Sequence, residues 1–135
     1  MTTHQQMMTD FCKTHKITFS FTEVMPSKMR QKGYGIGARH FRCFIKRKGC
    51  RVGCTYSMGS ALENDPKLEE FMHSVTLDAR CVEGLSFQDY CNEMGENNDS
   101  IKAYRVYLAC KKMAEKLRVL LGQTAYNELL QIEQE

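Results

Sequence analysis

The order of patterns along the chain predicts an α+β protein: an N-terminal helix, a three-stranded antiparallel sheet with a β-hairpin, then C-terminal helices packed on one face. Two-residue alternation of apolar residues occurs between residues 17 and 58, whereas apolar residues follow helical spacing from residue 65 onwards. Strands grouped before helices favour an antiparallel sheet over a parallel βαβ arrangement. The length of 135 residues suits a single domain covering residues 1–135.

The first two expected elements are a short helix over residues 3–14, capped by Thr3, and a strand over residues 17–22. Three apolar side chains fall on one side of the helix: Met7, Met8 and Phe11. In the strand, apolar residues alternate strictly with hydroxyl residues, which is typical of a half-buried strand.

Residues 39–58 predict a β-hairpin around Lys48-Gly49, a suitable two-residue turn because glycine tolerates a positive φ. This register places Cys43 opposite Cys54 and Ile45 opposite Val52. Both apolar sets then lie on one face of the sheet, whereas a slip of one residue would separate them.

Between the first strand and the hairpin, residues 27–38 predict a basic, glycine-rich loop that carries Lys28, Arg30 and Lys32. Its glycines lack the spacing and the following helix of a dinucleotide-binding fingerprint. The loop therefore gives no evidence of nucleotide binding.

The second half of the chain predicts helices. Asp65-Pro66 is expected to start one, with the aspartate as its cap. Ser86 is expected to cap a short helix that Gly95 ends.

The longest helix is expected over about residues 101–121, with Gly122 at its end, followed by a last helix capped by Thr124. The expected buried side of the long helix consists of Ala103, Tyr107, Cys110, Ala114, Leu117 and Leu121. No further apolar stripe points to dimerisation, and the sequence does not predict the oligomeric state.

Charge divides the chain into a basic, β-rich half and an acidic, helical half. Residues 1–60 contain 11 Lys and Arg against 2 Asp and Glu, whereas residues 61–135 contain 8 against 14. Such asymmetry indicates an electrostatic partner for one half, unless the two halves neutralise each other in the fold.

The seven cysteines are odd in number and form no regular framework, which favours free thiols in a reducing compartment. No apolar run approaches the roughly 18 residues that a membrane span needs. The N-terminus shows no basic region followed by an apolar stretch, so no secretory signal is expected. These features predict a cytoplasmic protein that does not contact a membrane.

No established catalytic motif is present, and we expect neither enzyme activity nor a cofactor. Cys50 and Cys54 would lie about 13 Å apart on one strand, too far to ligate one zinc ion. The cross-strand pair of Cys43 and Cys54 would need two more ligands. A thiol or zinc enzyme built on that pair is a remote alternative.

The remaining candidate is a cationic binding surface on the hairpin and the preceding loop. Its residues are Lys28, Arg30, Lys32, Arg39, His40, Arg42, Phe44, Lys46, Arg47, Lys48 and Arg51. They fit phosphate contacts with base stacking on Phe44, an acidic groove of a protein, or an edge strand protected from aggregation. A weaker candidate is the outer side of the long helix, with Lys102, Arg105, Lys112, Lys116 and Arg118.

Two stretches also carry a family resemblance. The first runs from Phe41-Arg42-Cys43 to Tyr56-Ser57-Met58-Gly59-Ser60, and the second contains Ser86-Phe87-Gln88-Asp89-Tyr90-Cys91-Asn92-Glu93-Met94-Gly95, Asp99-Ser100-Ile101-Lys102-Ala103-Tyr104 and Leu117-Arg118-Val119-Leu120-Leu121-Gly122. Together they resemble a family of small accessory proteins of tailed bacteriophages and prophages. The resemblance covers most of residues 39–130, and the chain departs from it between Ser60 and Leu85.

This resemblance implies a phage accessory protein that acts in the bacterial cytoplasm and has no known active site. Because small phage proteins often occlude a host machine, the leading hypothesis is a non-enzymatic protein that binds and inhibits a host defence complex, such as a CRISPR effector. The alternative is an accessory protein that binds nucleic acid directly through the basic hairpin.

Overall fold

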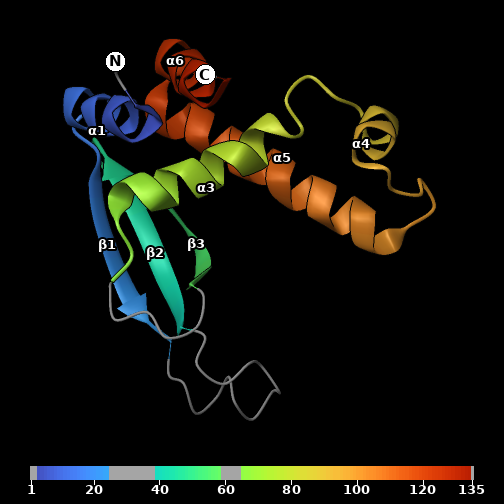
Figure 1. Cartoon of the computed structure of the whole chain (residues 1–135), viewed down its shortest axis with the longest axis horizontal. Helices are drawn as coiled ribbons and strands as arrows, with labels where there is room; N and C mark the ends of the chain where they lie inside the picture. The colour runs from blue at the N-terminus through green and yellow to red at the C-terminus, as the bar shows by residue number, and fades with distance from the viewer. Residues whose placement is uncertain (1–2, 25–38, 59–64, 135) are drawn as a thin grey trace.

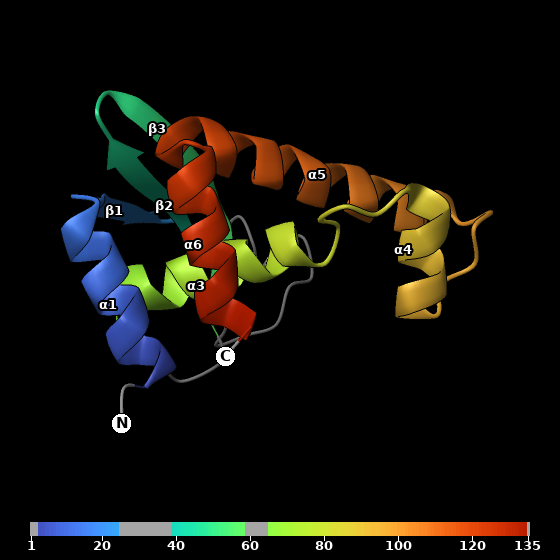
Figure 2. The same cartoon turned by 90° about the horizontal axis from the view of Figure 1, so that it is seen from above.

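The computed structural model describes residues 3–24, 39–58 and 65–134, and it confirms the predicted α+β class (Figures 1 and 2). The elements are α1 (His4–Thr14), β1 (Thr18–Glu23), β2 (Arg39–Arg47), β3 (Cys50–Met58), α3 (Leu68–Arg80), α4 (Phe87–Met94), α5 (Ile101–Leu121) and α6 (Gln123–Gln134). The three strands form one antiparallel sheet with β2 at its centre. The predicted basic loop with Lys28, Arg30 and Lys32 lies outside the described residues.

The hairpin has the predicted register. Cys43 pairs with Cys54 and Ile45 pairs with Val52. The turn residues Lys48 and Gly49 have φ of 49° and 81°, which is the backbone geometry of a tight two-residue hairpin turn.

One face of the sheet forms the main hydrophobic core. Phe41, Cys43, Ile45 and Val52 are buried, and α3 crosses the sheet on this side (Figures 1 and 2). The ring of Phe71 on α3 lies 5.7 Å from that of Phe19 and 6.0 Å from that of Tyr56, centroid to centroid. Helices α1, α5 and α6 complete this core.

The N-terminal part of α5 extends beyond the main core and packs against α4, which lies far from the sheet (Figures 1 and 2). A second, smaller cluster holds the two helices together: Val82, Tyr90, Cys91, Tyr107 and Cys110. The hydroxyl of Tyr107 donates to the Leu85 carbonyl at 2.7 Å. All six residues expected on the buried side of α5 are buried.

The helix ends follow the sequence signals with two exceptions. Thr3 and Ser86 cap their helices as predicted. The prediction that Asp65-Pro66 starts a helix was wrong, because the backbone is still extended at Lys67 and α3 begins at Leu68.

The predicted cap of the last helix was also wrong. Gly122 ends α5, and its carbonyl immediately accepts from the amide of Tyr126 at 2.9 Å. Helix α6 therefore begins at Gln123, and Thr124 lies inside its first turn.

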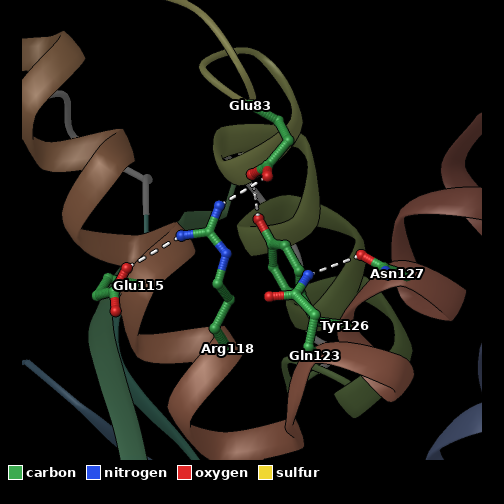
Figure 3. A network of polar contacts seen from close by, with 6 residues as sticks. All are labelled: Glu83, Glu115, Arg118, Gln123, Tyr126 and Asn127. Atoms are coloured by element: carbon green, nitrogen blue, oxygen red, sulfur yellow. Dashed lines mark hydrogen bonds and ion pairs between the residues drawn. The ribbon is translucent and has the colours of Figure 1, made fainter.

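A polar network joins α5 and α6 to the loop after α3 (Figure 3). The guanidinium of Arg118 donates to Glu83 at 2.6 Å and to Glu115 at 3.0 Å, and the hydroxyl of Tyr126 donates to Glu83 at 2.7 Å. The guanidinium carbon of Arg118 also lies 4.9 Å from the centre of the Tyr126 ring. The expectation that Arg118 belongs to an outer cationic side of α5 was wrong, because this network holds it.

Across the described stretches of the chain, no helix combines the length and the apolar character needed to cross a bilayer.

Candidate functional site

The face of the sheet opposite the core brings together five of the eleven predicted binding residues: His40, Arg42, Phe44, Lys46 and Arg51. Strand pairing arranges its outward side chains in four rows: Thr18–Lys46–Arg51, Ser20–Phe44–Gly53, Thr22–Arg42–Thr55 and His40–Ser57. We call these eleven residues the cationic face. They are exposed or half-buried, and they include three permanent cations and five hydroxyls but no Asp or Glu.

Two of the cations are direct neighbours. Lys46 and Arg51 are cross-strand partners, and both side chains are exposed. Like charges directly opposite each other destabilise a sheet. An anion placed between them would remove this repulsion, so the pair is suited to a negatively charged ligand.

Phe44 lies in contact with both arginines of this face. Its ring covers Gly53, where a Cβ atom would overlap ring carbons. The guanidinium carbons of Arg51 and Arg42 lie 4.6 and 5.7 Å from the ring centroid. Cation–π contacts of this kind restrain arginine side chains while leaving their N–H groups available to acceptors.

This arrangement changes the predicted role of Phe44. The sequence suggested an outward ring on which a base stacks, but the ring is half-buried beside Gly53 and between two arginines. Its clearest role is to position Arg42 and Arg51.

The far end of the face is polar. Nδ1 of His40 lies 2.8 Å from Oγ of Ser57, its cross-strand partner. Arg42 lies between Thr22 and Thr55 in the next row. Ser and Thr hydroxyls commonly supplement Lys and Arg in contacts to phosphate oxygens.

Arg47 does not belong to the cationic face, although the sequence analysis included it. Its guanidinium donates to the carbonyls of His15 at 3.0 Å, Leu120 at 3.1 Å and Leu121 at 3.3 Å. These carbonyls belong to the end of α1 and the last turn of α5. Arg47 therefore fixes the hairpin to the helices.

The two other hairpin cations lie outside the four rows of this face. Lys48 is exposed in the turn, beyond the last row. Arg39 is the first residue of β2 and pairs with Met58.

The thiols have properties unlike those of a nucleophile. Burial, reinforced by neighbouring Cys54, raises the pKa of Cys43 to about 11, and burial also raises the pKa of Cys54. Since the thiolate is the reactive form, neither group is activated at neutral pH. In the parts of the chain that the structure describes, no cluster of three or more His, Cys, Asp and Glu side chains could hold a metal ion.

A hollow of about 620 Å³ lies beside α3, with α1 and α6 along its rim. Its lining includes Glu69, Glu70 and Asp78. In the same hollow, His73 is paired with buried Glu133, the Nδ1–Oε2 distance being 2.8 Å. Its carboxylates make it unsuited to the anionic ligands that the cationic face favours.

Sequence reasoning missed the contribution of β1, which adds the hydroxyls of Thr18, Ser20 and Thr22 to the edge of the cationic face. The alternation of residues 17–22 contained the signal, because it placed these hydroxyls opposite the apolar side.

Comparison of the chain with protein-family models, curated proteins and solved structures gave no match.

Proposed function

We propose that this protein is a non-enzymatic binding protein whose cationic face contacts the phosphate backbone of single-stranded nucleic acid. The observation that carries this proposal is a sheet surface with Arg42, Lys46 and Arg51 and no carboxylate among its eleven described residues. Phosphate contacts of this kind need cations and hydroxyl donors rather than a base-reading motif.

The spacing of the cations supports contact with more than one phosphate. Arg42 and Lys46 are four residues apart on β2, which corresponds to about 13 Å along an extended strand. Arg51 lies beside Lys46 on β3. The face therefore offers positive charge at two separated places along one strand direction.

Nucleic acid fits this face better than an acidic protein groove does. Protein interfaces concentrate their binding energy in an apolar or aromatic centre. On the cationic face the one large apolar side chain is Phe44, and its ring already contacts Gly53 and two arginines. A phosphate backbone requires no such centre.

The test is fluorescence anisotropy with labelled single-stranded oligonucleotides of mixed sequence at several salt concentrations. We expect the logarithm of the binding constant to fall linearly with that of the salt concentration, with a slope of about 0.7 for each phosphate contacted. The variant with Arg42→Gln and Arg51→Gln should lose about 1.4 of that slope and bind at least tenfold more weakly at low salt.

The matched control replaces two exposed lysines of α5, Lys102→Gln and Lys111→Gln, which changes the net charge equally. Its affinity should stay near that of the wild type. Absence of wild-type binding at low salt would refute nucleic-acid binding, and equal losses in both variants would refute the assignment to the cationic face.

The resemblance to phage accessory proteins supports a second candidate, inhibition of a host defence complex such as a CRISPR effector. Affinity capture from bacterial lysates, with and without nuclease treatment, separates the two. Capture of one defence complex in both lysates, lost with Arg42→Gln and Arg51→Gln, would favour this inhibitor. Capture that disappears after nuclease treatment would favour direct nucleic-acid binding.

A further inference from the structure

The outward side of α5 carries large apolar residues that the fold leaves exposed. Ile101 is 70% exposed, Val119 68% and Leu108 45%. They lie on the side of the helix away from the buried residues Ala103, Tyr107, Cys110, Ala114, Leu117 and Leu121. The sequence predicted no extra apolar stripe, but the structure shows that this helix has one.

These apolar residues belong to a regular series. Ile101, Arg105, Leu108, Lys112, Glu115 and Val119 follow one another at steps of four, three, four, three and four, and all six are exposed. This is the spacing of a coiled-coil seam, which keeps one line of side chains facing a partner helix. We call these six residues the α5 seam.

The charges of the α5 seam distinguish between the two ways of pairing it with a copy of itself. A parallel pair would place Arg105 against Arg105, Lys112 against Lys112 and Glu115 against Glu115, all of them repulsive. An antiparallel pair centred between Leu108 and Lys112 places Arg105 against Glu115. Opposite charges on paired helices set partner choice and orientation in this way.

The same antiparallel register also matches the remaining positions. Ile101 meets Val119, so that the two most exposed apolar side chains of the helix cover each other. Leu108 meets Lys112, whose aliphatic stem can lie along the leucine while its ammonium group reaches water. Each contact occurs twice because a two-fold axis relates the chains.

We propose that two copies of this chain dimerise through an antiparallel pairing of their α5 seams. The contact runs from Ile101 to Val119, about 27 Å of helix at 1.5 Å per residue. The small α4 cluster contacts the opposite side of α5 and leaves the seam free. Glu115 already accepts from Arg118 but is 68% exposed, so its outer oxygen can reach a second arginine.

The first test is sedimentation velocity of the full chain over a wide range of concentration. The wild type should shift from monomer to dimer as concentration rises. In the variant Leu108→Lys, the introduced ammonium group faces Lys112 of the other copy. Because these like charges meet twice, the affinity of the dimer should fall by about 100-fold. Val106→Lys is the matched control: Val106 is also 45% exposed but lies off the seam, so its dimer should persist.

A charge-exchange experiment tests the antiparallel register itself. Arg105→Glu alone and Glu115→Arg alone should each be monomeric at concentrations where the wild type dimerises. Mixing the two variants should restore a dimer, as should combining both substitutions in one chain. Circular dichroism confirms that each variant keeps the wild-type helix content.

A wild type that stays monomeric at every concentration would overturn the proposal. The proposal would also be overturned if Leu108→Lys and Val106→Lys weakened the dimer equally. A dimer that the mixed variants fail to restore would overturn the antiparallel register.

Discussion

The cationic face of the sheet and the α5 seam are both exposed, yet they differ in composition. The cationic face holds three permanent cations, five hydroxyls and one half-buried aromatic ring. The α5 seam holds three exposed apolar side chains separated by charges of both signs. The first surface carries a net positive charge without an apolar centre, whereas the second carries apolar contacts in a self-complementary charge order.

The two proposals therefore assign these surfaces to different classes of partner. Attraction between cations and phosphates is long-ranged and falls steeply with salt. Apolar pairing is short-ranged and depends on the shape and register of the partner. On these proposals, mutations in one surface should leave binding by the other intact.

The largest expected effect is on stability, and it distinguishes Arg47 from its neighbour Lys46 in the hairpin. Arg47→Ala removes three hydrogen bonds from a charged donor to the ends of two helices and should lower the free energy of unfolding by about 3 kcal/mol. Lys46→Ala should leave stability within about 0.5 kcal/mol, since it also removes the repulsion from Arg51. Chemical denaturation followed by circular dichroism measures both.

Nucleic-acid binding should show the reverse: Lys46→Ala should weaken it, whereas Arg47→Ala should not. Lys46→Ala should reduce the salt slope by about 0.7, while folded Arg47→Ala should keep the wild-type slope. A wild-type slope for Lys46→Ala would show that Lys46 does not contact phosphate.

An intermediate effect is expected at Gly53. The substitution Gly53→Ala places a methyl group where the Phe44 ring lies, and should destabilise the fold by about 2 kcal/mol through overpacking. Displacement of the ring should also release Arg42 and Arg51 and weaken oligonucleotide binding. In a Phe44→Leu background the same substitution should have a smaller effect, which a double-mutant cycle measures.

The smallest effect concerns the network that anchors the C-terminal end of α5. Tyr126→Phe removes the hydrogen bond to Glu83 while keeping the ring beneath Arg118. It should lower the free energy of unfolding, measured by urea denaturation, by about 1 kcal/mol. The α5 seam should still dimerise, because it lies on another side of the helix. Loss of dimerisation in this variant would show that the two sides of α5 are coupled.

The same tyrosine gives this contribution a pH dependence. Burial, together with the hydrogen bond to Glu83, raises the pKa of Tyr126 in the folded protein. Its stabilising effect is therefore fully present below about pH 10, the ordinary tyrosine pKa, and is lost as the pH rises further. The wild type should lose stability above that pH more steeply than Tyr126→Phe.

Local patterns predicted the sheet well because strand parity carries much of the information. Alternation together with the Lys48-Gly49 turn was enough to pair Cys43 with Cys54 and to place Arg42 and Lys46 outward. The same parity places Arg47 on the inner side of the sheet. It was nevertheless assigned to the cationic surface because its side chain is charged. What no local pattern contained was its actual partner, the last turn of a helix more than seventy residues away.

Helix periodicity predicted the buried side of α5 but not the use of its other sides. Arg118 was expected outside because its partner Glu83 lies 35 residues earlier, in a loop without a pattern. The α5 seam was overlooked because charged residues occupy half of its positions. Its spacing becomes informative only once Ile101, Leu108 and Val119 are seen to be exposed.

The position of Arg47 also bears on how the molecule unfolds. Its three carbonyl partners come from both the basic and the acidic halves of the chain, namely His15 in the first, and Leu120 and Leu121 in the second. Opening the hairpin tip therefore releases the end of α1 and the end of α5 in the same event. Cleavage between the two halves should leave neither fragment folded, and the intact chain should lose its sheet and its helices in one cooperative transition.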